Sequence, residues 1–199
     1  MGNLSSIKNM LTRINVNSKI THNKEDIVSA NGVILPGVGA FDEAMKNLTD
    51  LGIIPLLNQI VNNNKPVLGI CLGMQLMTNK SEEGQLPGLG WIDAEVKKFD
   101  FKNNNLDLKI PHMGWNQIKI IQKSALFSGL DIESRFYFVH SYHVICNSRE
   151  NVLTETFYGY DFHSSFQMNN IVGVQFHPEK SHKFGMRFFM NLIDHLFCD

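Results

Sequence analysis

The sequence lacks the features that mark several classes of protein. Its 199 residues include 18 Lys and Arg against 19 Asp and Glu, a formal net charge of −1, so no basic field is available to attract phosphate backbones. Apolar runs are short: the longest extends from Val67 to Met77 and contains Gln75, whereas a membrane helix needs roughly 18 to 20 apolar residues. We therefore expect neither nucleic acid nor a membrane among the partners of this protein.

Cysteine is scarce as well. The chain has three, Cys71, Cys146 and Cys198, an odd number with no Cys-x-x-Cys spacing. This pattern fits neither a disulfide framework nor a structural zinc site. We expect a reducing, cytoplasmic compartment and a function that needs neither a metal nor another cofactor.

Hydrophobic residues, in contrast, make up 43% of the chain and are spread along it, which indicates one packed domain over residues 1–199. In the first half, helical and strand spacing alternate. The expected elements are a helix at 7–14, strand character at 16–20, a strand at 32–35, a helix at 40–51 and a strand at 67–70 that passes directly into a helix. This order predicts an α/β fold with a mostly parallel, doubly wound sheet, helices on both faces and functional groups at the carboxyl ends of the strands.

The second half is richer in strands. We expect them at residues 91–99, 116–121, 136–145, 152–157 and 171–175, with a turn at Asn103–Asn105. A helical apolar stripe then closes the chain over residues 182–197. These additional strands in the C-terminal half are expected to be antiparallel.

One short motif carries candidate chemistry. Residues Gly69–Gly73 (Gly-Ile-Cys-Leu-Gly) have the Gly-x-nucleophile-x-Gly form of a nucleophile elbow, with cysteine in place of serine. The sharp strand-to-helix turn needs neighbours without side chains, and the start of the helix would stabilise a thiolate and offer N–H groups to an oxyanion. The alternative is that Cys71 is a small buried core residue, the commonest fate of a free cysteine.

A thiol nucleophile needs a base, and His177 is the best placed of the eight histidines. It follows the apolar run 171–174, and Pro178 prevents an ordinary central strand from continuing. In an extended segment, side chains two residues apart point the same way, which would let Glu179 orient the imidazole. The alternatives are a capping or core histidine and a solvated carboxylate. The other histidines that we compared with it have no comparable setting and are expected to be surface or structural residues: His22, His163, His182 and His195.

Four segments together resemble the motif set of class I glutamine amidotransferases. They are Pro36–Gly39 (PGVG), Gly69–Gln75 (GICLGMQ), Pro111–Asn116 (PHMGWN) and Gln175–Ser181 (QFHPEKS). Within that class, PHMGWN and the segment Phe136–Tyr142 (FYFVHSY) are most similar to the glutaminase subunits of imidazole glycerol phosphate synthases. The resemblance runs along the full chain.

The resemblance implies a role for each matching position. Cys71 would attack the side-chain amide of glutamine, His177 would protonate the departing ammonia and then activate water, and Glu179 would hold the imidazole. The implied oxyanion site comprises Val38, Gly39 and Leu72. The implied glutamine-binding residues are Gly37, Gln75, Glu83, Ser141 and Tyr142.

The resemblance also implies a partner. In this family a cyclase subunit with a (β/α)8 barrel docks over the glutaminase site in a heterodimer and receives the ammonia for histidine biosynthesis. Pro111–Asn116 and Tyr137 would lie near that interface. Packing in the core explains the apolar and aromatic character of these residues equally well.

Two other functions stay open on the sequence. Residues Arg135–Cys146 and His182–Met186 resemble a paralogous branch that supplies ammonia for sugar amidation in surface-polysaccharide biosynthesis. Another cysteine hydrolase of similar architecture would use the elbow, but would need neither Pro36–Gly39 nor His177–Glu179. Members of the family begin with a strand ahead of the segment that matches Met1–Leu4, so we expect that first strand to be missing from this chain.

Overall fold

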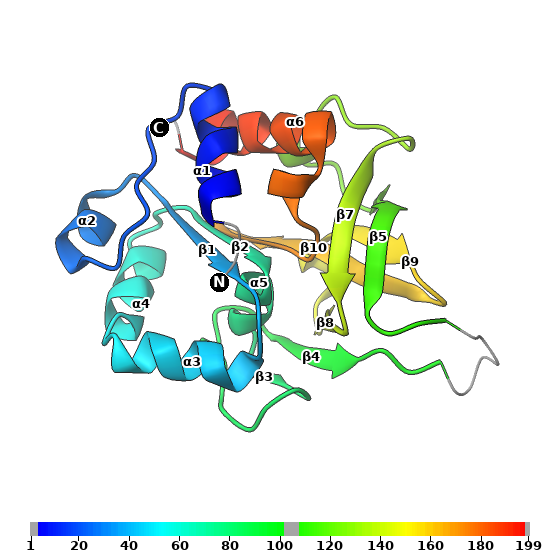
Figure 1. Ribbon diagram of the computed structural model, residues 1–199, viewed down its shortest axis with the longest axis horizontal. Helices are drawn as coiled ribbons and strands as arrows, with labels where there is room; N and C mark the ends of the chain where they lie inside the picture. Colours follow the sequence, from blue (N-terminus) through cyan, green and yellow to red (C-terminus); the bar gives the residue numbers. More distant parts are fainter. Residues whose placement is uncertain (1–3, 102–107, 198–199) are drawn as a thin grey trace.

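The computed structural model of the protein describes residues 4–101 and 108–197 (Figure 1). The turn expected at Asn103–Asn105 and the third cysteine, Cys198, lie outside the described residues.

A mixed sheet runs through the centre of the molecule (Figure 1). Its parallel part has the order β1–β2–β11, with bounds Val33–Gly37, Val67–Cys71 and Ile171–Val174. The sheet continues antiparallel through three more strands, β10 (Asp161–Met168), β8 (Tyr142–Cys146) and β4 (Ala94–Lys98). Three further strands complete the sheet. β3 (Lys80–Ser81) pairs with β4, β9 (Val152–Phe157) pairs with β10, and β6 (Lys119–Ile120) pairs with β9. The expected α/β class with antiparallel strands in the C-terminal half is confirmed.

Helices cover both faces of the parallel strands. Figure 1 shows α1 (Leu4–Arg13) and α6 (His182–Leu192) on one side, and α3 (Phe41–Asp50) and α4 (Ile54–Asn62) on the other. Neighbouring residues of β2 point into different layers: Leu68 belongs to the apolar cluster of the first side and Val67 to that of the second, as the period of a strand requires. None of the described helices is long and apolar enough to cross a membrane.

A separate two-stranded ribbon stands beside the main sheet. It pairs β5 (His112–Gln117) with β7 (Arg135–His140) in antiparallel register. Burial alternates along β5, so that His112 faces inward while Met113 and Trp115 are exposed. The ribbon is fastened to the chain after β11, because the His177 N–H donates to the Tyr137 carbonyl at 2.8 Å. The ribbon therefore lies directly against the candidate base.

Several expected elements differ in the structure. Residues 16–20 form no strand. Nζ of Lys19, in this segment, instead forms an ion pair with Asp26 at 2.6 Å. Asp26 belongs to α2 (Lys24–Ser29), a helix that the periodicity does not predict. Helix α4 was also not expected, and the closing helix ends at Leu192 and continues as a π-helical turn over Ile193–Phe197. Strand β10 was missed because its centre is polar: Ser164 and Ser165 are buried and both hydrogen-bond the Thr154 hydroxyl, at 2.8 and 2.6 Å.

Candidate active site

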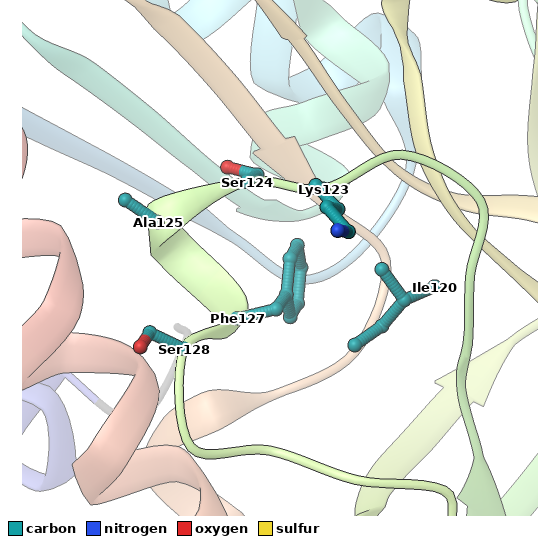
Figure 2. Close-up of a pocket in the computed structure, with 6 residues that line it drawn as sticks. All are labelled: Ile120, Lys123, Ser124, Ala125, Phe127 and Ser128. Carbon is teal, nitrogen blue, oxygen red and sulfur yellow. The ribbon is translucent and has the colours of Figure 1, made fainter.

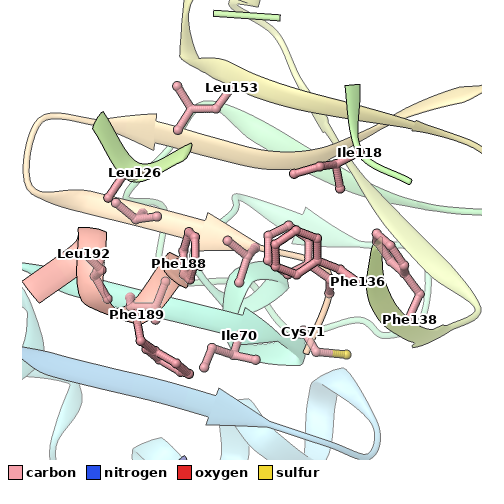
Figure 3. Packing of buried hydrophobic residues seen from close by; sticks show 14 of the residues in the cluster. Ile70, Cys71, Ile118, Leu126, Phe136, Phe138, Leu153, Phe188, Phe189 and Leu192 are labelled. Atoms are coloured by element: carbon pink, nitrogen blue, oxygen red, sulfur yellow. The ribbon is translucent and has the colours of Figure 1, made fainter. Parts of the chain in front are cut away.

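The site is built on the turn from β2 into α5 (Leu72–Leu76). Cys71 ends the strand and the helix begins at the next residue. Its backbone has φ 54° and ψ −110°, a conformation that residues with side chains adopt rarely and that is held by the surrounding structure. Cys71 is 7% exposed and lies at the edge of the apolar cluster that contains Ile70 and Phe138 (Figure 3). The thiol is therefore part of neither the surface nor the centre of the core.

Close backbone contact explains the glycines around this turn. A Cβ on Gly73 would overlap the carbonyl oxygen of Leu35 in β1. A Cβ on Gly37 would lie 2.8 Å from Cβ of Leu72. Strand β1 and the first turn of α5 are thus packed backbone to backbone, which brings the segment Pro36–Gly39 beside Cys71.

The expected oxyanion residues belong to the two segments that form this contact. Leu72 is the first residue of α5, where N–H groups have no acceptor within the helix. On the other side of the contact, Val38 and Gly39 follow β1, and Gly39 has φ +104°, which suits glycine. These three residues therefore come from two segments that touch through Gly37 and Leu72.

The candidate base and its orienting group are buried together. Nδ1 of His177 lies 2.8 Å from Oε1 of Glu179, and both side chains are almost inaccessible. The extended backbone expected between them is wrong, because Pro178–Lys180 form a 3-10 turn, η4. The contact forms nevertheless, and Glu179 is not a solvated carboxylate. A buried carboxylate this close holds the imidazole in one orientation with its Nδ1 protonated.

Cys71 and His177 interact without an aligned hydrogen bond. Burial by itself would lower the pKa of His177, but interactions with Cys71 and Glu179 outweigh burial and raise this pKa to about 9. Nε2 of His177 has no hydrogen-bond partner among the described residues, and the Cys71 thiol donates to the Val139 carbonyl at 3.8 Å. Catalytic hydrogen bonds of this kind often tighten only when substrate binds.

Two buried glutamines complete the surroundings of the thiol. Nε2 of Gln175 donates to Sγ of Cys71 at 3.7 Å, and its Oε1 accepts from Nε2 of Gln75 at 3.0 Å. The resemblance to the family implies a role for Gln75 but none for Gln175. Its position directly after β11 and two residues before His177 is the signal that could have identified Gln175.

Of the remaining expected binding residues, Glu83 contacts the start of α3. Oε2 of Glu83 accepts from the Phe41 N–H at 3.0 Å, and burial raises the pKa of Glu83. Burial also raises the pKa of Tyr142, with a further contribution from the negative charge of Glu83. Ser141 occupies the bend between β7 and β8, immediately before Tyr142. Glu83 and Tyr142 therefore lie close enough to each other to interact electrostatically.

The surface also has a pocket that lies apart from the expected site residues. A surface pocket of about 380 Å³ is lined by Ile120, the segment Lys123–Ala125, Phe127 and Ser128 (Figure 2), and contains none of the expected site residues. Within residues 4–101 and 108–197, no group of three or more potential ligands is arranged to hold a metal ion. The elbow and the turn after β11 bring together a thiol, an imidazole and a carboxylate.

The chain is similar to known proteins over almost its whole length. The sequence profile of class-I glutamine amidotransferases matches residues 1–194. Imidazole glycerol phosphate synthase subunit HisH 2 of Methanococcus maripaludis is 53% identical over 97% of this chain and 95% of its own. The subunit of the same name from Pseudomonas aeruginosa is 44% identical over 98% and 95%.

The fold is shared more widely. A solved structure of a glutamine amidotransferase superimposes with a TM-score of 0.75 over 97% of this chain and 93% of its own, at 18% identity. At this identity the likeness shows that the fold is shared. The chain belongs to the class I glutamine amidotransferases and, within them, to the family of HisH glutaminase subunits of imidazole glycerol phosphate synthase.

Proposed function

We propose that this protein hydrolyses the side-chain amide of glutamine with Cys71, His177 and Glu179 and delivers the ammonia to a cyclase subunit. The observation that carries the proposal is the strained elbow at Cys71, with φ 54°, next to a buried imidazole that is held by a carboxylate at 2.8 Å. A nucleophile, a base and an orienting group are the parts that covalent acyl transfer requires.

The proposed reaction has two stages. His177 takes the proton of the Cys71 thiol as Sγ attacks the carbonyl carbon of the amide, and the N–H groups of Leu72 and of the Val38–Gly39 segment stabilise the oxyanion. The C–N bond breaks, the nitrogen takes a proton from His177 and leaves as ammonia, and a γ-glutamyl thioester remains. His177 then takes a proton from water, which attacks the thioester. The C–S bond breaks, the proton passes from His177 to Sγ, and glutamate and the free thiol are released.

Binding of glutamine is assigned to residues around the elbow. Glu83 provides a carboxylate for the α-amino group, and Ser141 and Tyr142 provide polar groups for the α-carboxylate. Gly37 would contribute through its main chain, because Leu72 and Gly73 occupy the space that a side chain would need. Gln75 keeps the surroundings of the amide in place through its contacts with Gln175 and the Tyr142 carbonyl, both at 3.0 Å.

The partner would dock on the ribbon. The side chains of Met113 and Trp115 on β5 are 62% and 46% exposed, which is high for apolar residues of this size. Beside them, Nζ of Lys180 lies 5.4 Å from the ring centroid of Tyr137. A (β/α)8-barrel subunit covering this face would lie against the turn that carries His177, and ammonia could pass to it without entering bulk water.

The acceptor of the ammonia is the finer part of the proposal. We assign a ribulosyl aminoimidazole intermediate of histidine biosynthesis, in keeping with the names of the relatives that are 53% and 44% identical. The second candidate is a sugar in surface-polysaccharide biosynthesis, favoured by the resemblance of residues 135–146 and 182–186 to that branch. Both candidates need the same glutaminase chemistry.

The test measures glutamate released from glutamine with and without each candidate partner. Cys71→Ala should abolish release, while His195→Gln, far from the elbow in sequence, should retain it. Undiminished release by Cys71→Ala would remove the proposal. Stimulation by a cyclase subunit assigns the acceptor to histidine biosynthesis, and stimulation by a sugar-amidating synthase alone assigns it to the second pathway.

A further inference from the structure

The reaction proposed above leaves a group of buried histidines unused. His112 on β5, His140 on β7 and His143 on β8 are 3%, 6% and 3% exposed. They lie among aromatic rings, and the His112 ring is stacked against Tyr158, with ring centroids 4.1 Å apart. Burying polar rings is costly unless their nitrogens are hydrogen-bonded, so the partners of these nitrogens are informative.

One end of this group is fixed by a backbone carbonyl. Nδ1 of His140 lies 2.7 Å from the carbonyl oxygen of Tyr142. A carbonyl can only accept, so Nδ1 of His140 carries the proton and donates. If the ring is neutral, its Nε2 must then be an acceptor.

The other end is fixed independently by an amide. Oδ1 of Asn116 accepts from the Gln117 N–H at 2.8 Å, and Nδ2 of Asn116 donates to the Phe157 carbonyl at 2.9 Å. These two bonds settle which end of the amide is nitrogen. The second hydrogen of Nδ2 points to Nε2 of His112, 3.2 Å away, so this nitrogen is an acceptor and Nδ1 of His112 carries the proton.

The tautomers deduced for His140 and His112 both fit one hydrogen bond between the two rings. Nδ1 of His112 lies 3.0 Å from Nε2 of His140, and the first is a donor and the second an acceptor by the arguments above. All bonds in the chain Asn116, His112, His140, Tyr142 therefore run in one direction, and a proton added to either ring would set two N–H groups against each other. Burial has the matching effect: it lowers the pKa of His112 to about 4 and that of His140 well below its usual value.

This chain of bonds continues to the nucleophile. The Tyr142 carbonyl also accepts from Nε2 of Gln75, whose other hydrogen is donated to Oε1 of Gln175. Nε2 of Gln175 then faces Sγ of Cys71 at 3.7 Å. His140 thus fixes the bend at Ser141 and, through one shared carbonyl, the two amides next to the thiol.

We propose that Asn116, His112 and His140 are positioning residues, which hold the bend at Ser141 and the Gln75–Gln175 pair in the geometry that Cys71 needs. This inference rests on the proposed function of Cys71 as the nucleophile. None of the three residues is expected to touch glutamine.

The first test reads the tautomers directly. Nitrogen-15 NMR of the histidine-labelled protein should show both His112 and His140 protonated at Nδ1 and unprotonated at Nε2. Neither ring should titrate between pH 8 and pH 5.5. The titratable groups that face the pair are His143, the His177 imidazole and the Tyr158 phenol, so the spectra are assigned with single variants of these residues. An Nε2–H tautomer, or a midpoint near 6.5, in either ring overturns the proposal.

The second test separates positioning from stability. His112→Phe fills the same space without either hydrogen bond, and should lower kcat for glutamine and the rate of Cys71 alkylation by iodoacetamide at least about tenfold. His112→Gln can donate and accept, and should restore part of both rates. The matched control is His143→Phe, because His143 is equally buried but bonds the Tyr160 hydroxyl at 3.0 Å, outside the chain. It should lower stability and leave both rates within about twofold.

The rates of these variants decide whether His112 has a positioning role. Equal losses of rate in His112→Phe and His143→Phe, or unchanged rates in His112→Phe, overturn the positioning role. If His112→Phe does not fold, Asn116→Leu is judged by the same rates: it removes the first donor of the chain, with the Asn116 bonds to Phe157 and Gln117, at the partly exposed end. Glutamate release by Cys71→Ala would refute the proposed function instead, and would leave the tautomer result standing.

Discussion

Nδ1 of His177 lies 2.8 Å from Oε1 of Glu179, with Pro178 alone between the two residues. The turn that joins them is fixed by Ser181, whose hydroxyl donates to the His177 carbonyl at 2.6 Å and accepts from the Tyr137 N–H at 3.0 Å. Base and orienting group therefore belong to one rigid turn, and this turn is tied to the ribbon. The predictions below follow from the contacts of this turn and of the elbow.

Glu179→Gln should lower kcat for glutamine hydrolysis by roughly 10²- to 10⁴-fold, as loss of the orienting carboxylate does in comparable triads. The pKa of His177 should also fall, because burial opposes its protonation and one of the interactions that raise this pKa is lost. Both effects can be measured, by steady-state kinetics and by NMR titration of the imidazole. Glu150→Gln, at an exposed position, is the control. An unchanged His177 titration would contradict the assigned contact.

Gln175→Leu should slow the reaction of Cys71 with both glutamine and iodoacetamide. The substitution removes the N–H that faces Sγ at 3.7 Å and leaves the Gln75 amide without its partner oxygen. A loss of about 10- to 100-fold in kcat is expected for one misplaced donor. Gln167→Leu, on β10 and partly exposed, is the matched control. If both variants keep the rate of the parent protein, Gln175 has no part in activating the thiol.

Gly73→Ala should destabilise the protein by more than about 2 kcal/mol, because the new methyl group overlaps a backbone carbonyl of β1 that cannot move independently. Gly52→Ala is the control: it has room for the methyl group and φ +62°, so it costs about 1 kcal/mol of backbone strain alone. Urea denaturation of the two variants measures the difference. Equal costs would show that the close approach of α5 to β1 is not maintained in solution.

Acid should weaken the fold through the buried histidines. In the folded protein, burial lowers the pKa of His112 and of His143 from 6.5 to about 4. The stability that these groups contribute is therefore complete above pH 6.5 and is lost as the pH falls towards 4. The free energy of unfolding should fall by about 1.4 kcal/mol per pH unit for each histidine that takes up a proton only on unfolding.

Denaturation of His143→Phe at several pH values isolates one of these contributions. The variant should show a slope between pH 6 and pH 4.5 that is smaller than the parent slope by about 1.4 kcal/mol per pH unit. His22→Phe changes an exposed histidine and should keep the parent slope. Parallel curves for all three proteins would contradict the burial of a neutral His143.

Local patterns in the sequence predicted much of the parallel half of the fold. The strand at Val67–Cys71 and its direct passage into α5 follow from one uninterrupted apolar run, and the close approach of His177 to Glu179 follows from two neighbouring positions in the chain. Strand β10 could not be predicted, since its buried serines are satisfied by Thr154 of another strand. In the same way, Gln75 and Gln175 lie 100 residues apart, and only the pairing of distant strands brings them to Cys71.

The contact between Gly73 and the Leu35 carbonyl has a consequence for how this family can change. It is made by main-chain atoms on both sides, so the spacing between the thiol and the oxyanion segment does not depend on which apolar side chains fill the layers above and below the sheet. Core residues can be exchanged for others of similar volume while the reacting groups keep their places. Sequences can therefore drift far apart around an elbow whose dimensions are set by the backbone.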